Sequence, residues 1–225
     1  MIRAGAALAV VLTLLAGGEA AAGVPTDQLR RSVDLVLKIL SDPQLKTEAK
    51  TAERRRMIRA VANEIFDFGE ISQRSLARYW QPRTPAERKE FIGLFGNLLE
   101  HAYISKIETY SGEKIRYVGE VPDGDRVVVR TLIVTKQNTE IPVDYRMFQQ
   151  GERWRAYDVT IEGISLVANY RAQFNTIIQR TGYPDLVAKL KAKEAEHPDP
   201  RETGPGAEGS EPPTAGPPTP RRQSP

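Results

Sequence analysis

The segment VTIEGISLVANYRAQFNTIIQRTG (Val159–Gly182) decides the fold, because a strand ends and an amphipathic helix begins within it. Its first residues alternate between apolar and polar, which is the period of a β-strand. Its later apolar residues recur at helical spacing and share one broad face. They are Leu166, Tyr170, Phe174, Ile177 and Ile178. The segment therefore predicts a sheet that passes directly into a covering helix.

The chain before this segment predicts the rest of the sheet. Four strands lie between Lys114 and Ile161, joined by short turns as in an antiparallel meander. The second strand, Arg126–Lys136, is apolar on both faces, which predicts a central position. In the last strand, Tyr157, Val159 and Ile161 are predicted to share one face.

Helical patterns precede the sheet, and one more follows Gly182. The clearest start is Thr84, with Pro85 at the first helical position and Glu87 three residues after the cap, which is a capping box. The inner stripe of the second helix is predicted to be Met57, Val61 and Ile65. The predicted helices are Thr26–Leu40, Thr47–Phe66, a short one after Gly69, Thr84–Tyr110 and Asp185–Glu196. The fold class is therefore α+β, with helices packed on a four-stranded antiparallel sheet, similar in outline to the NTF2-like fold.

The two ends of the chain differ from its middle. Residues 1–22 combine Arg3, a short apolar run and Ala20-Ala21-Ala22 before Gly23, which predicts a cleaved export signal. Residues 197–225 are rich in Pro, Gly and charge, and we expect them to be disordered. Residues 23–196 then form one domain outside the cytoplasm. The chain has no Cys, so its core must stabilise it without disulfides.

The charge is only mildly basic. The predicted signal is neutral and the tail carries −1, so the net charge of +3 becomes +4 for residues 23–196. This value argues against nucleic acid as a partner. The basic run on the second helix is usually a solvated face, and here it is also the candidate partner-docking site. Its candidate residues are Arg54, Arg55 and Arg59.

Catalytic and metal-binding patterns are missing from the sequence. It contains none of the common nucleotide-binding, hydrolase or zinc motifs. His101, Asp67 and Glu162 are each expected to play structural roles, Asp67 as a helix cap or ion-pair partner, and Asp123 and Asp125 belong to a turn. We therefore expect no catalytic residue, no metal and no cofactor.

Four segments together resemble the MlaC (toluene-tolerance) family of periplasmic phospholipid carriers. They are FDFGEIS (Phe66–Ser72), YWQPRTPAERKEFIGLFGNLL (Tyr79–Leu99), HAYISKIETYSGEKI (His101–Ile115) and YDVTIEGISLVANYRAQF (Tyr157–Phe174). The resemblance implies a cone-shaped fold whose interior receives acyl chains. It also implies an inner-membrane ABC transporter with a lipid-binding ring and an outer-membrane lipoprotein–porin complex as partners. Some relatives are associated with hopanoid gene clusters, so the cargo is expected to be a phospholipid or a hopanoid.

On this basis we expect an apolar cavity between the sheet and the helices. The predicted lipid-binding residues are Val143, Tyr145, Met147, Tyr157, Val159, Phe174, Ile178, Phe91, Phe95 and Tyr103. Two alternatives stay open. One is an NTF2-like isomerase or hydrolase that uses Asp67 or Asp144 with a tyrosine, and the other is an envelope lipoprotein chaperone.

Overall fold

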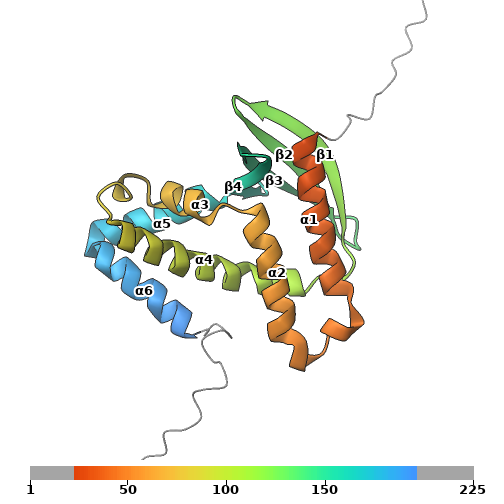
Figure 1. The fold of residues 1–225 in the computed structure, drawn as a ribbon, viewed down its shortest axis with the longest axis horizontal. Helices are drawn as coiled ribbons and strands as arrows, with labels where there is room; N and C mark the ends of the chain where they lie inside the picture. The colour runs from red at the N-terminus through yellow and green to blue at the C-terminus, as the bar shows by residue number, and fades with distance from the viewer. Residues whose placement is uncertain (1–22, 197–225) are drawn as a thin grey trace, which may run out of the picture.

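The computed structural model describes residues 23–196, as helices around one antiparallel sheet (Figure 1). The predicted export signal and C-terminal tail lie outside the described residues. The helices are α1 (Val24–Ser41), α2 (Thr51–Ile65), α3 (Phe68–Leu76), α4 (Pro85–Glu108), α5 (Leu166–Thr181) and α6 (Tyr183–Glu196). The short 3-10 turns are Pro43–Leu45, Glu48–Lys50 and Ala77–Tyr79. The strands are β1 (Lys114–Asp123), β2 (Arg126–Val134), β3 (Glu140–Gln150), β4 (Arg153–Ile161) and β5 (Ile164–Ser165).

The sheet follows chain order, β1-β2-β3-β4-β5, with every neighbour antiparallel. It has five strands where the sequence predicted four, because β5 is a two-residue strand that pairs with the end of β4. Val129, Tyr145 and Val159 lie opposite one another across β2, β3 and β4. Residues paired in this way share a face of the sheet, which we call the inner face.

A β-bulge in β4 corrects one prediction. Arg146 pairs with Asp158 and Met147 pairs with Ala156, so Tyr157 is an extra residue without a partner of its own. The extra residue reverses the alternation, and Tyr157 does not share the inner face with Val159. Its ring instead lies 6.2 Å from that of Phe148. The guanidinium groups of Arg74 and Arg126 also lie over it, 4.3 and 5.2 Å from its centre.

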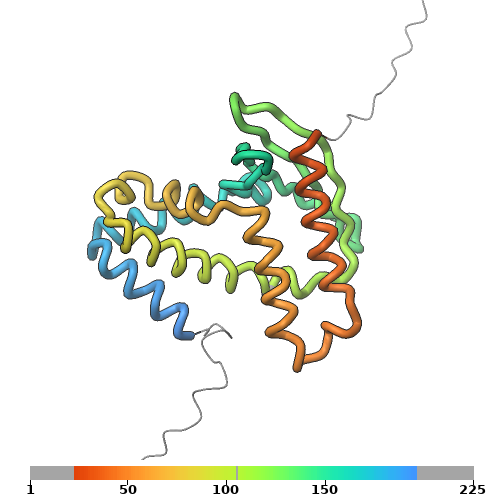
Figure 2. The backbone as a smooth tube through the Cα atoms, in the orientation of Figure 1, coloured from red at the N-terminus to blue at the C-terminus, as the bar shows by residue number. Residues whose placement is uncertain are grey.

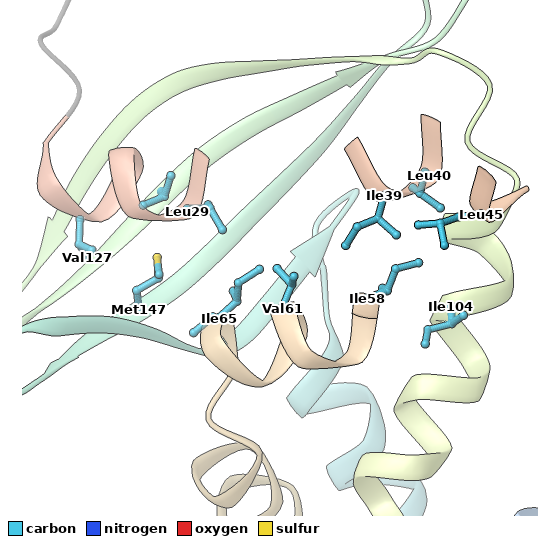
Figure 3. Close-up of a cluster of buried hydrophobic side chains, with 12 residues drawn as sticks. Leu29, Ile39, Leu40, Leu45, Ile58, Val61, Ile65, Ile104, Val127 and Met147 are labelled. Atoms are coloured by element: carbon cyan, nitrogen blue, oxygen red, sulfur yellow. The ribbon is translucent and has the colours of Figure 1, made fainter. Parts of the chain in front are cut away.

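The helices α1 and α2 cover the inner face and form one hydrophobic cluster with it, the sheet cluster (Figure 3). Its buried members are Leu29, Ile39, Leu40, Leu45, Ile58, Val61, Ile65, Ile104, Val127, Val129, Met147 and Ala156. The inner stripe of α2 therefore contains Ile58 and not Met57, which is exposed. The predicted buried face of α2 was therefore wrong at Met57 only. Ile58, Val61 and Ile65 recur at the spacing of one helix face.

The remaining helices pack against one another beyond β4 as a second cluster, the helical cluster (Figures 1 and 2). Its buried members are Ile71, Leu76, Trp80, Phe91, Leu94, Phe95, Leu99, Val167, Phe174, Tyr183, Leu186 and Leu190. The predicted capping box of α4 is confirmed. Thr84 Oγ1 accepts the Glu87 N–H at 3.2 Å, and Glu87 Oε2 accepts the Thr84 N–H at 2.7 Å.

Candidate functional site

Phe66 packs against both clusters, and we use the name seam for Phe66 together with four other partly buried aromatic residues that pack against one cluster or the other. The others are Phe68, Tyr103, Tyr145 and Tyr170. Tyr145 packs against the sheet cluster, and Phe68, Tyr103 and Tyr170 against the helical cluster. Ligand pockets are lined mainly by hydrophobic and aromatic side chains. The seam is therefore the candidate site.

Backbone and side-chain bonds hold Phe66 at the junction. It forms an isolated parallel bridge with Ala156 of β4, and the Asp67 N–H donates to the Ala156 carbonyl at 2.9 Å. Arg155 Nη2 donates to the Phe66 carbonyl at 2.6 Å and to that of Asn63 at 2.8 Å. The end of α2 is thus fixed to the sheet. The ring centres of Phe66 and Phe68 lie 6.1 Å apart.

The tyrosines of the seam are neutral at physiological pH. Burial raises the pKa of Tyr145 to about 12, although the side chain keeps intermediate exposure. Burial also raises the pKa of Tyr103, and the pKa of Tyr170 rises through burial and then through the nearby Tyr103. A neutral phenol donates and accepts hydrogen bonds without placing a charge in an apolar region. The seam therefore offers apolar rings with a few polar tips.

Helix α4 connects the two clusters across the seam. It gives Ile104 to the sheet cluster and Phe91, Leu94, Phe95 and Leu99 to the helical cluster. Because α4 contacts α2, α3 and α6, its apolar residues are spread over more than one face of the helix. Figure 2 shows α4 running from the helical half towards α2 and ending beside the start of β1.

The three arginines of the predicted docking face form ion pairs between α2 and α4. Arg54 and Arg55 each pair with Glu108 at 2.8 Å, and Arg59 pairs with Glu100. The side chains of Arg54 and Arg59 are only 13 and 15% exposed. Arg54 and Arg59 therefore hold α2 to α4 and are largely withdrawn from solvent, whereas the side chain of Arg55 remains 40% exposed beside them. The sequence could not reveal this, because their partners lie more than 40 positions away.

The structure divides the ten predicted lipid-binding residues into two sets plus Tyr157. Val143, Tyr145, Met147 and Val159 belong to the inner face of the sheet. The other five belong to or pack against the helical cluster: Phe91, Phe95, Tyr103, Phe174 and Ile178. The rings of Phe91, Phe95 and Phe174 lie 5.0 to 5.7 Å apart. They fill their region as close-packed core and leave the seam as the boundary between the sets.

Two surface pockets lie elsewhere, between α4 and α6, with volumes of about 180 and 500 Å³. The smaller is lined by Leu98, His101, Ala102, Leu190, Lys193 and Glu194. The larger is lined by Ala86, Lys89, Glu90, Gly93, Leu94, Asn97, Lys191 and Glu194. Neither contains any of the ten predicted residues.

The acidic candidates occupy structural positions. Asp67 Oδ1 accepts the Glu70 N–H at 2.8 Å, which confirms the predicted cap of α3. Asp144 lies on the sheet face opposite to Tyr145, since adjacent strand residues alternate. Glu162 is exposed in the turn between β4 and β5 with a φ of 49°. Within residues 23–196 there is no group of three acidic or histidine side chains arranged to hold a metal.

Sequence reasoning did not assign a site role to Phe66, Phe68 or Tyr170. A usable signal was present, because FDF places two aromatics around a helix cap, where the chain changes direction. Across the part of the chain described, no helix has the length and apolarity required to cross a bilayer.

Known proteins resemble this chain in sequence and in fold. The "Intermembrane phospholipid transport system binding protein MlaC" of Haemophilus influenzae is 22% identical over 162 residues, 68% of this chain and 76% of that protein. The "Toluene tolerance protein ttg2D" of Pseudomonas putida is 24% identical over 124 residues, 54% of this chain and 58% of that protein. A phospholipid-binding protein from Ralstonia solanacearum, solved in complex with a phospholipid, superposes with a TM-score of 0.68 at 25% identity. That match covers 76% of this chain and 97% of the solved one.

The family model for the MlaC protein matches residues 30–192, which span both clusters, the whole sheet and the seam. The chain therefore belongs to the MlaC family.

Proposed function

We propose that this protein binds phospholipid and carries it between the inner and outer membranes of the cell envelope. One observation carries the proposal: 76% of this chain superposes on 97% of a solved protein that contains a bound phospholipid. Membership of the MlaC family supports the same function and identifies a transport protein, not an enzyme. The capping role of Asp67 and the position of Asp144 on the face opposite to Tyr145 also weigh against the isomerase or hydrolase alternative.

The energetics explain why such a carrier is needed. Burying one CH₂ group is worth about 0.8 kcal/mol, so two acyl chains of about sixteen carbons represent roughly 25 kcal/mol relative to water. A lipid cannot cross an aqueous space unaided against that cost. The carrier must therefore bind the acyl chains with a free energy close to this value. Much tighter binding would prevent release of the lipid.

We infer that the acyl chains enter at the seam. We place the inner-face residues Val143, Tyr145 and Val159 on one side of the chains, and Tyr103 and Ile178, which pack against the helical cluster, on the other. Because Phe91, Phe95 and Phe174 pack tightly, we assign them to the wall behind the chains. Lipid entry then requires the two clusters to move apart at the partly buried side chains of the seam. The close-packed core of each cluster stays intact during this movement.

The envelope location rests on the predicted export signal. We propose that residues 1–22 direct export and are removed before Gly23, which leaves the carrier in the periplasm. The proposed partners are an inner-membrane ABC transporter with a lipid-binding ring and an outer-membrane lipoprotein–porin complex.

Purification of the exported protein, followed by solvent extraction and mass spectrometry, tests this function. We expect close to one phospholipid per protein. A hopanoid would change the cargo but keep the carrier function, and a protein-linked acyl chain would support the lipoprotein chaperone. Protein that is repeatedly free of lipid, when purified without detergent, would contradict the proposal.

A further inference from the structure

The first helix begins without a cap of its own. Its N-cap is Gly23, which has no side chain to accept a backbone hydrogen bond. A residue far along the chain supplies the acceptor instead, since Glu120 Oε1 in β1 accepts the Thr26 N–H at 2.8 Å. Thr26 is almost fully buried, with 1% of its surface exposed. Glu120 therefore closes the start of α1 from the neighbouring strand.

The same carboxylate lies against Gly23 itself. A Cβ atom placed on Gly23 would overlap Glu120 Oε2. The backbone nitrogen and a Cβ are both bonded to Cα and lie about 2.5 Å apart, so the Gly23 nitrogen is within about 5 Å of that oxygen. This close approach matters because Ala20-Ala21-Ala22 comes directly before Gly23.

We propose that removal of residues 1–22 creates an ion pair between the new α-ammonium of Gly23 and the carboxylate of Glu120. This inference rests on the proposed cleavage after Ala22. Hydrolysis consumes one water, breaks the Ala22–Gly23 amide bond, leaves a carboxylate on Ala22 and leaves an amine on Gly23 that takes up a proton. A neutral amide next to Glu120 thus becomes a cation.

Helix electrostatics explain why the pair is needed. The N-terminus of a helix carries partial positive charge, so an ammonium placed there is unfavourable unless an anion balances it. Glu120 is placed to interact with both the helix terminus and the ammonium. The absence of a side chain at position 23 keeps the carboxylate close. Cleavage therefore adds an ion pair to the hydrogen bond that already joins α1 to β1 at the edge of the sheet, and the precursor lacks this ion pair.

A double-mutant cycle tests the pair directly. Four chains are compared, each released from an N-terminal fusion by a protease that leaves no extra residue. Two begin at Gly23 and two at Ala20, and each start carries either Glu120 or Glu120→Gln. The Gln variant keeps an oxygen that can accept the Thr26 N–H but removes the charge. All four extend to Pro225, so they differ only at the start and at position 120.

Urea unfolding at neutral pH and low salt gives the result. We expect Glu120→Gln to raise the unfolding equilibrium constant about twofold to fivefold more in the chain that begins at Gly23 than in the one that begins at Ala20. An equal effect in both chains would overturn the pair. Intact mass analysis of the exported protein must also give Gly23 as its first residue, and any other start would overturn the inference. Lipid extraction from the same sample tests the carrier function separately.

Discussion

Asp158 in β4 accepts the backbone N–H of Val167, in the first turn of α5, at 3.0 Å. Its second oxygen accepts the Ser165 hydroxyl at 2.6 Å, and Asp158 itself is 7% exposed. One buried carboxylate thus joins the strand to the helix within the segment that decides the fold. Through α5, it also positions Phe174 in the helical cluster.

Replacement of Asp158 by Asn should destabilise the protein by about 1–3 kcal/mol, because a buried charge-assisted acceptor at a helix N-terminus is weakened. Urea denaturation of both proteins measures the change. Asp125→Asn is the control, since the Asp125 side chain is 92% exposed and its loss should cost less than about 0.5 kcal/mol. Equal effects of the two substitutions would contradict the assigned role of Asp158.

A bulky residue on the inner face should block lipid at the seam. Val159 is partly buried opposite Tyr145, so Val159→Trp should fill space between the clusters and reduce co-purified lipid at least severalfold. Thr160→Trp is the matched control, because Thr160 is the next residue of β4 and lies on the other face. Lipid per folded protein is measured by mass spectrometry, with folding checked by circular dichroism. Full occupancy in folded Val159→Trp would remove the inner face from the site.

The α2–α4 connection should weaken in acid. Burial alone would raise the pKa of Glu108, but hydrogen bonds from Arg55 and Arg54 outweigh it and hold the pKa below its ordinary value. A carboxyl with a lowered folded pKa contributes stability above its unfolded pKa, and this contribution is lost as the pH falls through the folded value. The ordinary value for Glu is about 4.3. The contribution of Glu108 is therefore present at pH 7 and declines below about pH 4.

Glu108→Gln should cost about 1–3 kcal/mol at pH 7 and clearly less at pH 3, as measured by urea denaturation at both pH values. Glu64→Gln is the control, since Glu64 pairs with Arg153 on the surface with 60% of its side chain exposed. Exposed pairs contribute about 0–1 kcal/mol. A Glu108→Gln deficit that is the same at pH 3 as at pH 7 would show that the charge of Glu108 is unimportant.

The parts of the fold that depend on local spacing were predictable from sequence. The capping box of α4 involves residues three apart, and the strands and turns of the sheet follow a two-residue period. The bulge at Tyr157 was not predictable, because one extra residue in a strand is set by its pairing with β3. Similarly, the direction of Arg54 and Arg59 is decided by Glu108 and Glu100 on a distant helix.

The candidate site was predictable in composition but not in arrangement. The sequence identified apolar residues on the last strands and on the helices that form α4 and α5. It could not show that Phe91, Phe95 and Phe174 pack on one another, because both a filled core and a lined cavity favour the same residue types. The seam depends on how the two clusters meet in space, which sequence spacing does not reveal. Among the partly buried residues around the clusters, Phe66 alone packs against both.

Gly93 should be replaceable by Ala with a gain in stability. It lies in the middle of α4, is exposed, and a Cβ atom built there meets nothing within 4 Å. Glycine in a helix interior costs about 0.8–1.0 kcal/mol relative to alanine. We therefore expect Gly93→Ala to raise the melting temperature by about 2–4 °C, as measured by differential scanning calorimetry.

Gly163→Ala is the opposite case for this prediction, since Gly163 adopts a φ of 82° that a side chain disfavours. That substitution should destabilise the protein by about 1–2 kcal/mol. Because Gly93 lines the pocket between α4 and α6 and not the seam, its replacement should leave lipid occupancy unchanged. Lost lipid in a stabilised Gly93→Ala protein would instead place cargo between α4 and α6 and contradict the assignment of the seam.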